Sequence, residues 1–159
     1  MYKTKLAYFL SMFAIAFLYS CNSDKIYEEY KDVNELQWHK TNIISFDVNI
    51  TDVVPEYKIS IAVRFIEGCP YMNFPVNISR LGPDGKTETF SADIKLRDED
   101  ENYLGSVIGN IYDLTIPVRE NVAFEKPGIY KFTIENSSDQ DPLIFISEIG
   151  FIIEKQKTE

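Results

Sequence analysis

The strongest constraint on the fold is a period-two alternation of apolar and polar residues. In residues 44–50, for example, Ile44, Phe46, Val48 and Ile50 alternate with polar side chains. Seven segments carry the pattern: 44–50, 57–65, 74–78, 90–96, 112–118, 130–134 and 149–153. Successive side chains of a strand point to opposite faces, so these segments predict half-buried strands. A short run at 122–124 brings the expected number to about eight, and no long segment has helical spacing.

Proline and glycine mark the boundaries of these segments. Gly82-Pro83-Asp84-Gly85 predicts a tight turn that joins two strands into a hairpin, and Lys126-Pro127-Gly128 predicts another turn. Pro75 predicts an edge strand or the first residues of a strand, because proline cannot donate to a ladder. Pro117 predicts that the 112–118 strand ends there or just after it.

Clean alternation means that most strands have one buried face and one wet face. Two antiparallel sheets packed face to face satisfy that requirement. We therefore predict an all-β, two-sheet antiparallel β-sandwich, jelly-roll-like, with about eight strands. A closed barrel is the alternative, and the sequence does not separate the two.

The N-terminal segment predicts export. Lys3 and Lys5 precede an apolar run at 6–18, which is shorter than the roughly 20 residues that a spanning helix needs. This is the layout of a signal peptide, which we place at residues 1–20. Leu18-Tyr19-Ser20-Cys21 resembles a bacterial lipobox, although Tyr19 stands where a small residue is usual. The resemblance implies cleavage before Cys21 and acylation of that cysteine; an ordinary signal peptide with a coincidental cysteine is the alternative.

The predicted mature chain has 139 residues, enough for one domain. Without Lys3 and Lys5 it carries 14 basic and 25 acidic residues, a net charge of −11. Such a surface argues against nucleic acid and against adhesion to anionic headgroups, so attachment to a membrane has to come from lipid. We expect residues 21–36 to form the lipidated Cys21 and a tether whose Tyr27 and Tyr30 dock on the domain, and residues 37–159 to form the sandwich.

Few residues suggest chemistry. Cys69 is the second of two cysteines and is expected to be a buried, inert thiol. Trp38 and His39 adjoin just before the first predicted strand of the sandwich. Trp38 is expected to plug one end of the sandwich, whereas an exposed Trp38, with exposed tyrosines, would bind a sugar.

The acidic stretch at 98–102 partly matches a calcium loop. Asp98, Asp100 and Asn102 occupy alternate positions, but Tyr103 stands where such a loop needs glycine, so a solvated loop is preferred over a loose calcium site. Loss of an activity on substitution of Asp98 or Asp100 would support a third, weaker hypothesis, an enzyme. No spacing nominates a nucleophile with a base, so we expect no enzyme and no cofactor.

Motifs along nearly the whole mature chain resemble the gliding-motility lipoprotein H family (GldH). They are Cys21, Ile26-Tyr27-Glu28-Glu29-Tyr30, Trp38-His39-Lys40, Tyr103-Leu104-Gly105, Gly109-Asn110-Ile111-Tyr112-Asp113, Asn121-Val122-Ala123-Phe124, the run 127–135, Asp141-Pro142-Leu143 and Ile149-Gly150. The order and spacing of these motifs carry the resemblance, since none is specific alone. We assign no feature of that family to residues 66–72.

The resemblance implies a cell-envelope lipoprotein of Bacteroidota, associated with gliding motility and linked to type IX secretion. It implies no catalytic residues. The expected role is a lipid-anchored, non-catalytic accessory component of that machinery, facing the periplasm or in the outer membrane. Expected partners are the membrane, through Cys21, and other envelope proteins, with contacts through Tyr27, Tyr30, Trp38 and His39. The alternative is a carbohydrate-binding envelope lipoprotein.

Overall fold

A computed structural model of the protein describes residues 24–156, which contain eleven strands and one 3-10 turn, η2 (Asn34–Leu36). The strands are β1 (Lys25–Asp32), β2 (Gln37–Trp38), β3 (Ile44–Ile50), β4 (Tyr57–Ile66), β5 (Asn73–Leu81), β6 (Thr87–Lys95), β7 (Ser106–Ile108), β8 (Ile111–Val122), β9 (Gly128–Asn136), β10 (Leu143–Ile144) and β11 (Ile146–Lys155). Every pair of neighbouring strands is antiparallel. The predicted all-β antiparallel class is confirmed.

The number of strands and sheets differs from the prediction. The described residues form three sheets: β1-β11-β4-β8-β7, β3-β9-β5-β6 and β10-β2. The prediction of about eight strands in two sheets was wrong. The run at 122–124 is the end of β8 and the start of a loop, β1 lies in the segment predicted as a tether, and β2, β7 and β10 have only two or three residues each. A strand that short contains too few residues to show an alternation.

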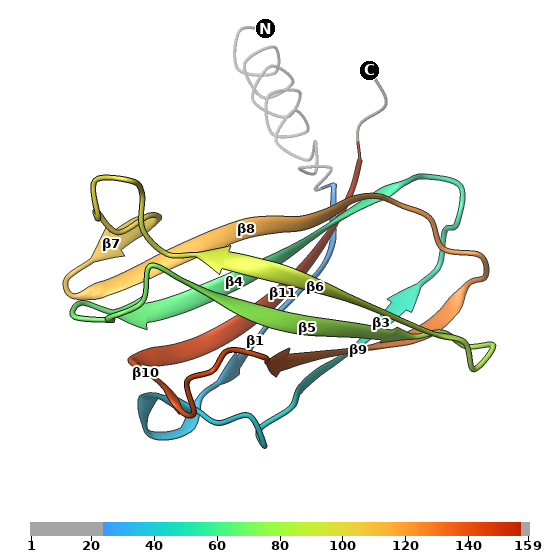
Figure 1. Ribbon diagram of the computed structural model, residues 1–159. Coiled ribbons are helices and arrows are strands. Elements are labelled where there is room, and N and C mark those ends of the chain that lie inside the picture. Colours follow the sequence, from blue (N-terminus) through green and yellow to red (C-terminus); the bar gives the residue numbers. More distant parts are fainter. Residues whose placement is uncertain (1–23, 157–159) are drawn as a thin grey trace, which may run out of the picture.

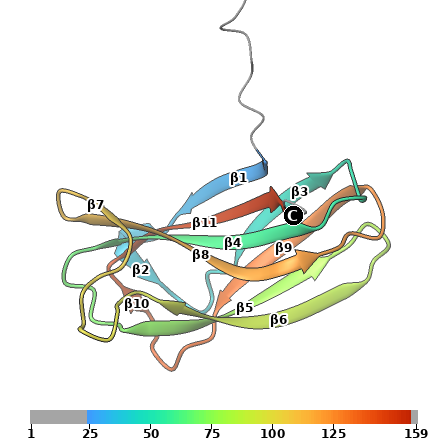
Figure 2. The same ribbon diagram turned by 90° about the horizontal axis from the view of Figure 1, so that it is seen from above.

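The eight longer strands pack as two layers, seen from two directions in Figures 1 and 2. Counted in chain order, these eight run 1-8-3-6 in one layer and 2-7-4-5 in the other. This order places the first strand beside the last and is that of a jelly roll. The sheets are open, so the barrel alternative does not apply.

Aromatic rings join the two layers in the middle of the core. Phe151 of β11 stacks on Phe46 of β3, with ring centroids 5.4 Å apart, and lies 4.7 Å from Phe132 of β9. Tyr27 of β1 packs edge-on against both Phe46 and Phe151. The three phenylalanines are almost completely buried, and large rings of this kind fill the roughly 10 Å between packed sheets.

The segment predicted as a tether is largely a strand. Residues 25–32 form β1, which pairs with β11 from Lys25↔Glu154 to Asp32↔Glu148. Its apolar residues did not show a period of two because they face both ways: Tyr27 points into the core, and Tyr30 lies on the outer face. The domain therefore begins close to Cys21, which lies outside the described residues.

The two prolines behave differently from each other. Pro75 is the third residue of β5, just beyond the stretch paired with β9, which agrees with a position near the start of a strand. Pro117 does not end its strand, and β8 continues to Val122. The short β7 pairs only with the first three residues of β8, so at Pro117 the outer side of β8 has no ladder for the missing N–H to interrupt.

The sandwich has two ends, which we name by where the chain enters. At the proximal end β1 begins and β11 finishes, beside the loops 51–56, 82–86 and 123–127. At the distal end lie the loops 39–43, 67–72, 97–105, 109–110 and 137–142. Strand β4 runs from the proximal to the distal end with ten residues, which at about 3.3 Å each span about 30 Å.

Candidate functional site

Exposed apolar side chains gather at the two ends of the sandwich. At the distal end the described residues expose Ile43, Met72, Val107, Ile108, Ile111, Ile144 and Phe145. At the proximal end they expose Ile26, Val54, Leu81 and Ile129. Among the described strands longer than three residues, none has an exposed large apolar residue in its middle. Gathered apolar side chains mark contact surfaces better than scattered ones do, so the ends are the candidate sites.

Three strand ends and the residue between β10 and β11 place apolar residues in one row on the distal end, which we name the distal apolar row: Phe145, Ile66, Ile111 and Ile108. Ile66 of β4 pairs with Ile111 of β8, which pairs in turn with Ile108 of β7. The amide of Ile66 donates to the carbonyl of Phe145, with N and O 3.0 Å apart, which adds the fourth member. Ile108 is 85% exposed.

The distal apolar row lies on the outer face of the five-stranded sheet. Arg64 lies two residues before Ile66, Asp113 lies two residues after Ile111, and these paired residues form an ion pair on that face. Side chains alternate along a strand, so Ile66 and Ile111 share the face of Arg64 and Asp113. The distal apolar row therefore lies at the distal edge of this face, next to the Arg64–Asp113 ion pair.

Backbone geometry holds Phe145 and the β7–β8 hairpin in place. Phe145 has φ = 65°, a left-handed conformation that bulky residues rarely adopt. Such outliers persist only where neighbouring contacts impose them, and they cluster at functional positions. A Cβ on Gly105 (φ = 96°) would lie 2.5 Å from the carbonyl oxygen of Asp113, so only glycine allows the chain to enter β7 so close to β8.

Strand β7 is also an edge strand with all three residues exposed. An edge presents unpaired backbone groups to which another chain can add a strand. Val107, 53% exposed, points away from the row formed by its neighbour Ile108. The distal end therefore offers both apolar side chains and free backbone groups.

Arg64 lies on the outer face of the five-stranded sheet, between its two ends, and contacts three neighbouring side chains. Its guanidinium contacts Glu148 at 2.6 Å and Asp113 at 2.8 Å and lies 5.0 Å from the ring centroid of Tyr30. Hydrogen bonds with Asp113 and Glu148 raise the pKa of Arg64 further. The ring of Tyr30 lies across Gly150, where a Cβ would come within 2.7 Å of it. These contacts fasten β1 to the outer face.

The four residues predicted for docking are not brought together. Tyr27 is half-buried in the core. Its burial is the main cause of a raised pKa, and its hydrogen bond to Glu29 is the second cause. Tyr30 lies on the opposite face of the same strand, under Arg64. Trp38 is fully buried, donates to the carbonyl of Asn42 at 2.9 Å and packs against Phe74. His39 is exposed, 3.4 Å from Asp141.

The burial of Trp38 confirms its predicted role as a plug at one end of the sandwich. A fully buried indole cannot stack on a sugar ring, so the carbohydrate-binding alternative loses its named platform. The seven tyrosines in residues 24–156 are all buried or half-buried, so none of them offers an exposed ring to a sugar.

The acidic stretch at 98–102 is a loop closed on itself. The Asp98 carboxylate accepts hydrogen bonds from the amides of Asp100 and Asn102, each at 2.9 Å, and from the Asn102 side chain. Bonds from Asn102 lower the pKa of Asp98. Within residues 24–156, no three His, Cys, Asp or Glu side chains gather as a metal site would require.

Cys69 is fully buried, as predicted, and burial raises the pKa of its thiol. Its carbonyl accepts hydrogen bonds from Arg97 at 2.7 Å and Tyr103 at 2.9 Å, and the Arg97 guanidinium lies 4.2 Å from the Tyr103 ring centroid. These contacts pin the loop 67–72 against the start of loop 97–105. Cys69 thus belongs to the scaffold of the distal end.

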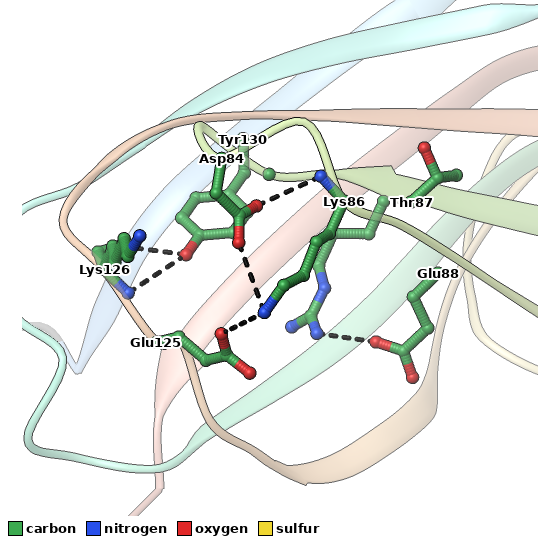
Figure 3. A pocket seen from close by; sticks show the side chains of 9 residues that line it. Asp84, Lys86, Thr87, Glu88, Glu125, Lys126 and Tyr130 are labelled. Atoms are coloured by element: carbon green, nitrogen blue, oxygen red, sulfur yellow. Dashed lines mark hydrogen bonds and ion pairs between the residues drawn. The ribbon is translucent and has the colours of Figure 1, made fainter.

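A depression of about 200 Å³ lies at the proximal end, between the β5–β6 turn and the β8–β9 loop (Figure 3). Lys86 reaches across it to Glu125 at 2.9 Å and Asp84 at 3.4 Å, and Arg80 contacts Glu88 at 2.6 Å. Its basic groups are largely matched by acids, and its volume is below the usual range of ligand pockets. We assign no ligand to it.

Among the described residues no helix has the length and apolar character needed to cross a membrane. The fold and surfaces define an all-β sandwich module whose exposed apolar residues lie at its ends. A model of the GldH lipoprotein family matches residues 25–153. The chain belongs to the GldH lipoprotein family, which assigns it to the lipoproteins of gliding motility and confirms the predicted resemblance.

Two curated relatives align along most of their length. The chain is 27% identical to the gliding motility lipoprotein GldH homolog of Christiangramia forsetii, covering 92% of this chain and 94% of that protein. It is 24% identical to the gliding motility lipoprotein GldH of Flavobacterium johnsoniae, covering 91% and 94%.

Solved structures resemble the chain only weakly. The VP2 subviral particle of infectious bursal disease virus matches 81% of this chain and 30% of its own, with a TM-score of 0.37 and 18% identity. A GH115 4-O-methyl-α-glucuronidase matches 81% and 14%, with a TM-score of 0.36 and 11% identity. We draw nothing about function from either.

Proposed function

We propose that the chain is a lipid-anchored, non-catalytic accessory component of the gliding-motility and type IX secretion-associated machinery of the cell envelope. Acylated Cys21 holds it on a membrane, and the distal apolar row docks another envelope protein of that apparatus. The observation that carries the docking step is the row itself, in which Ile108, Ile111 and Phe145 stay exposed beside the half-buried Ile66.

Position supports a protein as the occupant of the row. Strand β1 begins four residues after Cys21, at the proximal end, and pairs with β11 there. The distal apolar row lies about 30 Å further along β4. A bilayer that holds Cys21 is thus near the proximal end. The distal apolar row faces away from that bilayer and is available to another envelope protein.

Two further observations support a non-catalytic role. The Cys69 thiol is buried and held in its neutral form by a raised pKa, whereas a nucleophile needs an accessible thiolate. His39 is exposed beside Asp141, on the loop that follows β2. Neither group has the geometry of a nucleophile paired with a base.

The test is photo-crosslinking in living cells. A photoreactive amino acid replaces Ile108 in one strain and Ser91, exposed in the middle of β6, in a matched control strain. We expect Ile108 to crosslink a discrete envelope protein of the gliding apparatus and Ser91 not to do so. The substitution Ile108→Asp should abolish spreading of the cells while the protein level stays unchanged.

The anchor is tested separately. Mass spectrometry of the protein extracted from membranes should show an N-terminal, acylated Cys21, and Cys21→Ala should remove the protein from the membrane fraction. Crosslinks of equal yield and identity at Ile108 and Ser91 would contradict the docking role. Normal membrane fractionation of the Cys21→Ala protein would contradict the anchor.

A further inference from the structure

The loop between β3 and β4 presents an apolar tip that the fold does not use. Val54, at the tip of loop 51–56, is 91% exposed, more than any other large apolar side chain in residues 24–156. The loop is held firmly, because Asp52 accepts from the Val54 amide at 3.1 Å through its carboxylate and from the Tyr57 hydroxyl at 2.6 Å through its carbonyl. Val54 is thus displayed by a fixed turn.

This loop lies beside the point where the chain enters the domain. The Lys155 ammonium contacts the Asp52 carboxylate at 3.3 Å, and the Lys155 amide donates to the carbonyl of Asp24 at 2.7 Å. Lys155 therefore bridges loop 51–56 and the first described residue. Lys25 follows Cys21 by four positions, and four residue-to-residue steps reach at most about 14 Å.

Val54 is not isolated at this end. Ile129 is 64% exposed, and Leu81 and Ile26 are exposed as well. Four lysines around them are matched by acids: Lys58 by Glu154, Lys86 by Asp84 and Glu125, Lys155 by Asp52 and Lys25 by Glu28. Lys126 in loop 123–127 is the lysine of this end for which the described residues supply no ion pair. The proximal end therefore offers apolar side chains among largely neutralised charges, which suits a zwitterionic surface better than an anionic one.

We propose that the proximal end rests directly on the bilayer, with Val54 inserted at the interface between headgroups and acyl chains. The inference rests on the proposed acylation of Cys21, because the short connection is what keeps loop 51–56 at the membrane. An acyl anchor and an inserted apolar side chain on one rigid domain act together, since the first raises the effective concentration of the second at the surface. The contact fixes the orientation of the domain and turns the distal apolar row away from the membrane.

The test places an environment-sensitive fluorophore on Val54→Cys of the acylated protein in vesicles of phosphatidylcholine and phosphatidylethanolamine. Ile108→Cys, at a position of similar exposure at the distal end, is the matched control, and the wild-type protein measures labelling of the buried Cys69. We expect a blue shift and quenching by shallow lipid-borne quenchers at position 54, and neither at position 108. Phosphatidylglycerol should not strengthen the signal.

A spacer variant separates insertion from mere proximity. A Gly/Ser insertion of about 12 residues between Ser23 and Asp24 adds about 20 Å of reach, and it should weaken the shift at position 54 without releasing the protein. An unshifted signal at position 54 in a protein whose Cys21 is acylated would overturn the membrane contact and leave the proposed anchor standing. A shift that depends on protein concentration in detergent without vesicles would show self-association instead and would also overturn it. An unacylated Cys21 in the native protein would instead remove the proposed anchor.

Discussion

Replacing Gly150 with alanine tests whether residues 25–32 are a docked strand. The new Cβ would lie 2.7 Å from Cε1 of Tyr30 and 2.9 Å from Cβ of Ala62, closer than real contacts allow. Gly150 does not have a left-handed φ, so the backbone itself accepts alanine, and glycine in a strand interior is otherwise unfavourable by about 0.5–1 kcal/mol. Overpacking of this kind costs about 1–3 kcal/mol, so we expect a net loss of stability.

The double mutant with Tyr30→Ala isolates the contact. Without the ring of Tyr30 the closest clash disappears, while the contact with Ala62 remains. Gly150→Ala should therefore cost about 1 kcal/mol less in the Tyr30→Ala background than in the wild type, a coupling within the range seen for residues in contact. Urea unfolding of the chain without its first 21 residues, followed by circular dichroism, measures all four proteins.

Equal costs of Gly150→Ala in both backgrounds would refute the reasoning, because the ring would then not lie over Gly150. A stabilising Gly150→Ala would do the same. Either result would mean that residues 25–32 are not held against β11 as the structure has them, and a tether would again be the better description of this segment.

Three other properties follow from single groups. The Arg119 and Arg80 contacts lower the pKa of Glu88 below 4.5, so Glu88→Gln should reduce the free energy of unfolding at pH 7 by about 0.5–1 kcal/mol, and the difference should fade as the pH falls below 4.5; urea titrations at several pH values measure it. The buried Cys69 thiol should react with a disulfide reagent only after unfolding, and rapid reaction in the native protein would contradict its burial. Trp38 should emit at short wavelength and red-shift on unfolding, and sugars should leave its emission unchanged.

The sequence predicts the long strands well because each has one wet and one dry face. Residues 44–50 form β3 with alternate side chains buried, and Gly82-Pro83-Asp84-Gly85 makes the predicted hairpin turn, with the Gly85 amide donating to Gly82 at 3.0 Å. The burial of Trp38 and Cys69 also follows from their sequence context.

Other features depend on three-dimensional neighbours that no local pattern encodes. In β1, Glu29 and Lys31 pair with each other at the sheet margin, so the strand lacks an apolar stripe. The distal apolar row assembles from single residues of separate strands, which are up to 79 positions apart between Ile66 and Phe145. The position of Val54 near the start of the domain is set by tertiary contacts that place loop 51–56 beside Asp24, and no local sequence pattern predicts these contacts.

The pairing of the first strand with the last also governs when this chain can fold. Strand β1 has no partner until β11, more than a hundred residues later, becomes available, so the five-stranded sheet closes only once almost the whole polypeptide is present. Contacts this distant in sequence form slowly, because the chain loses the entropy of loop closure before strand pairing can stabilise it. Under the proposed export and acylation, this strand order would keep the domain unfolded during translocation and would leave Cys21 accessible to modifying enzymes until β1 pairs with β11.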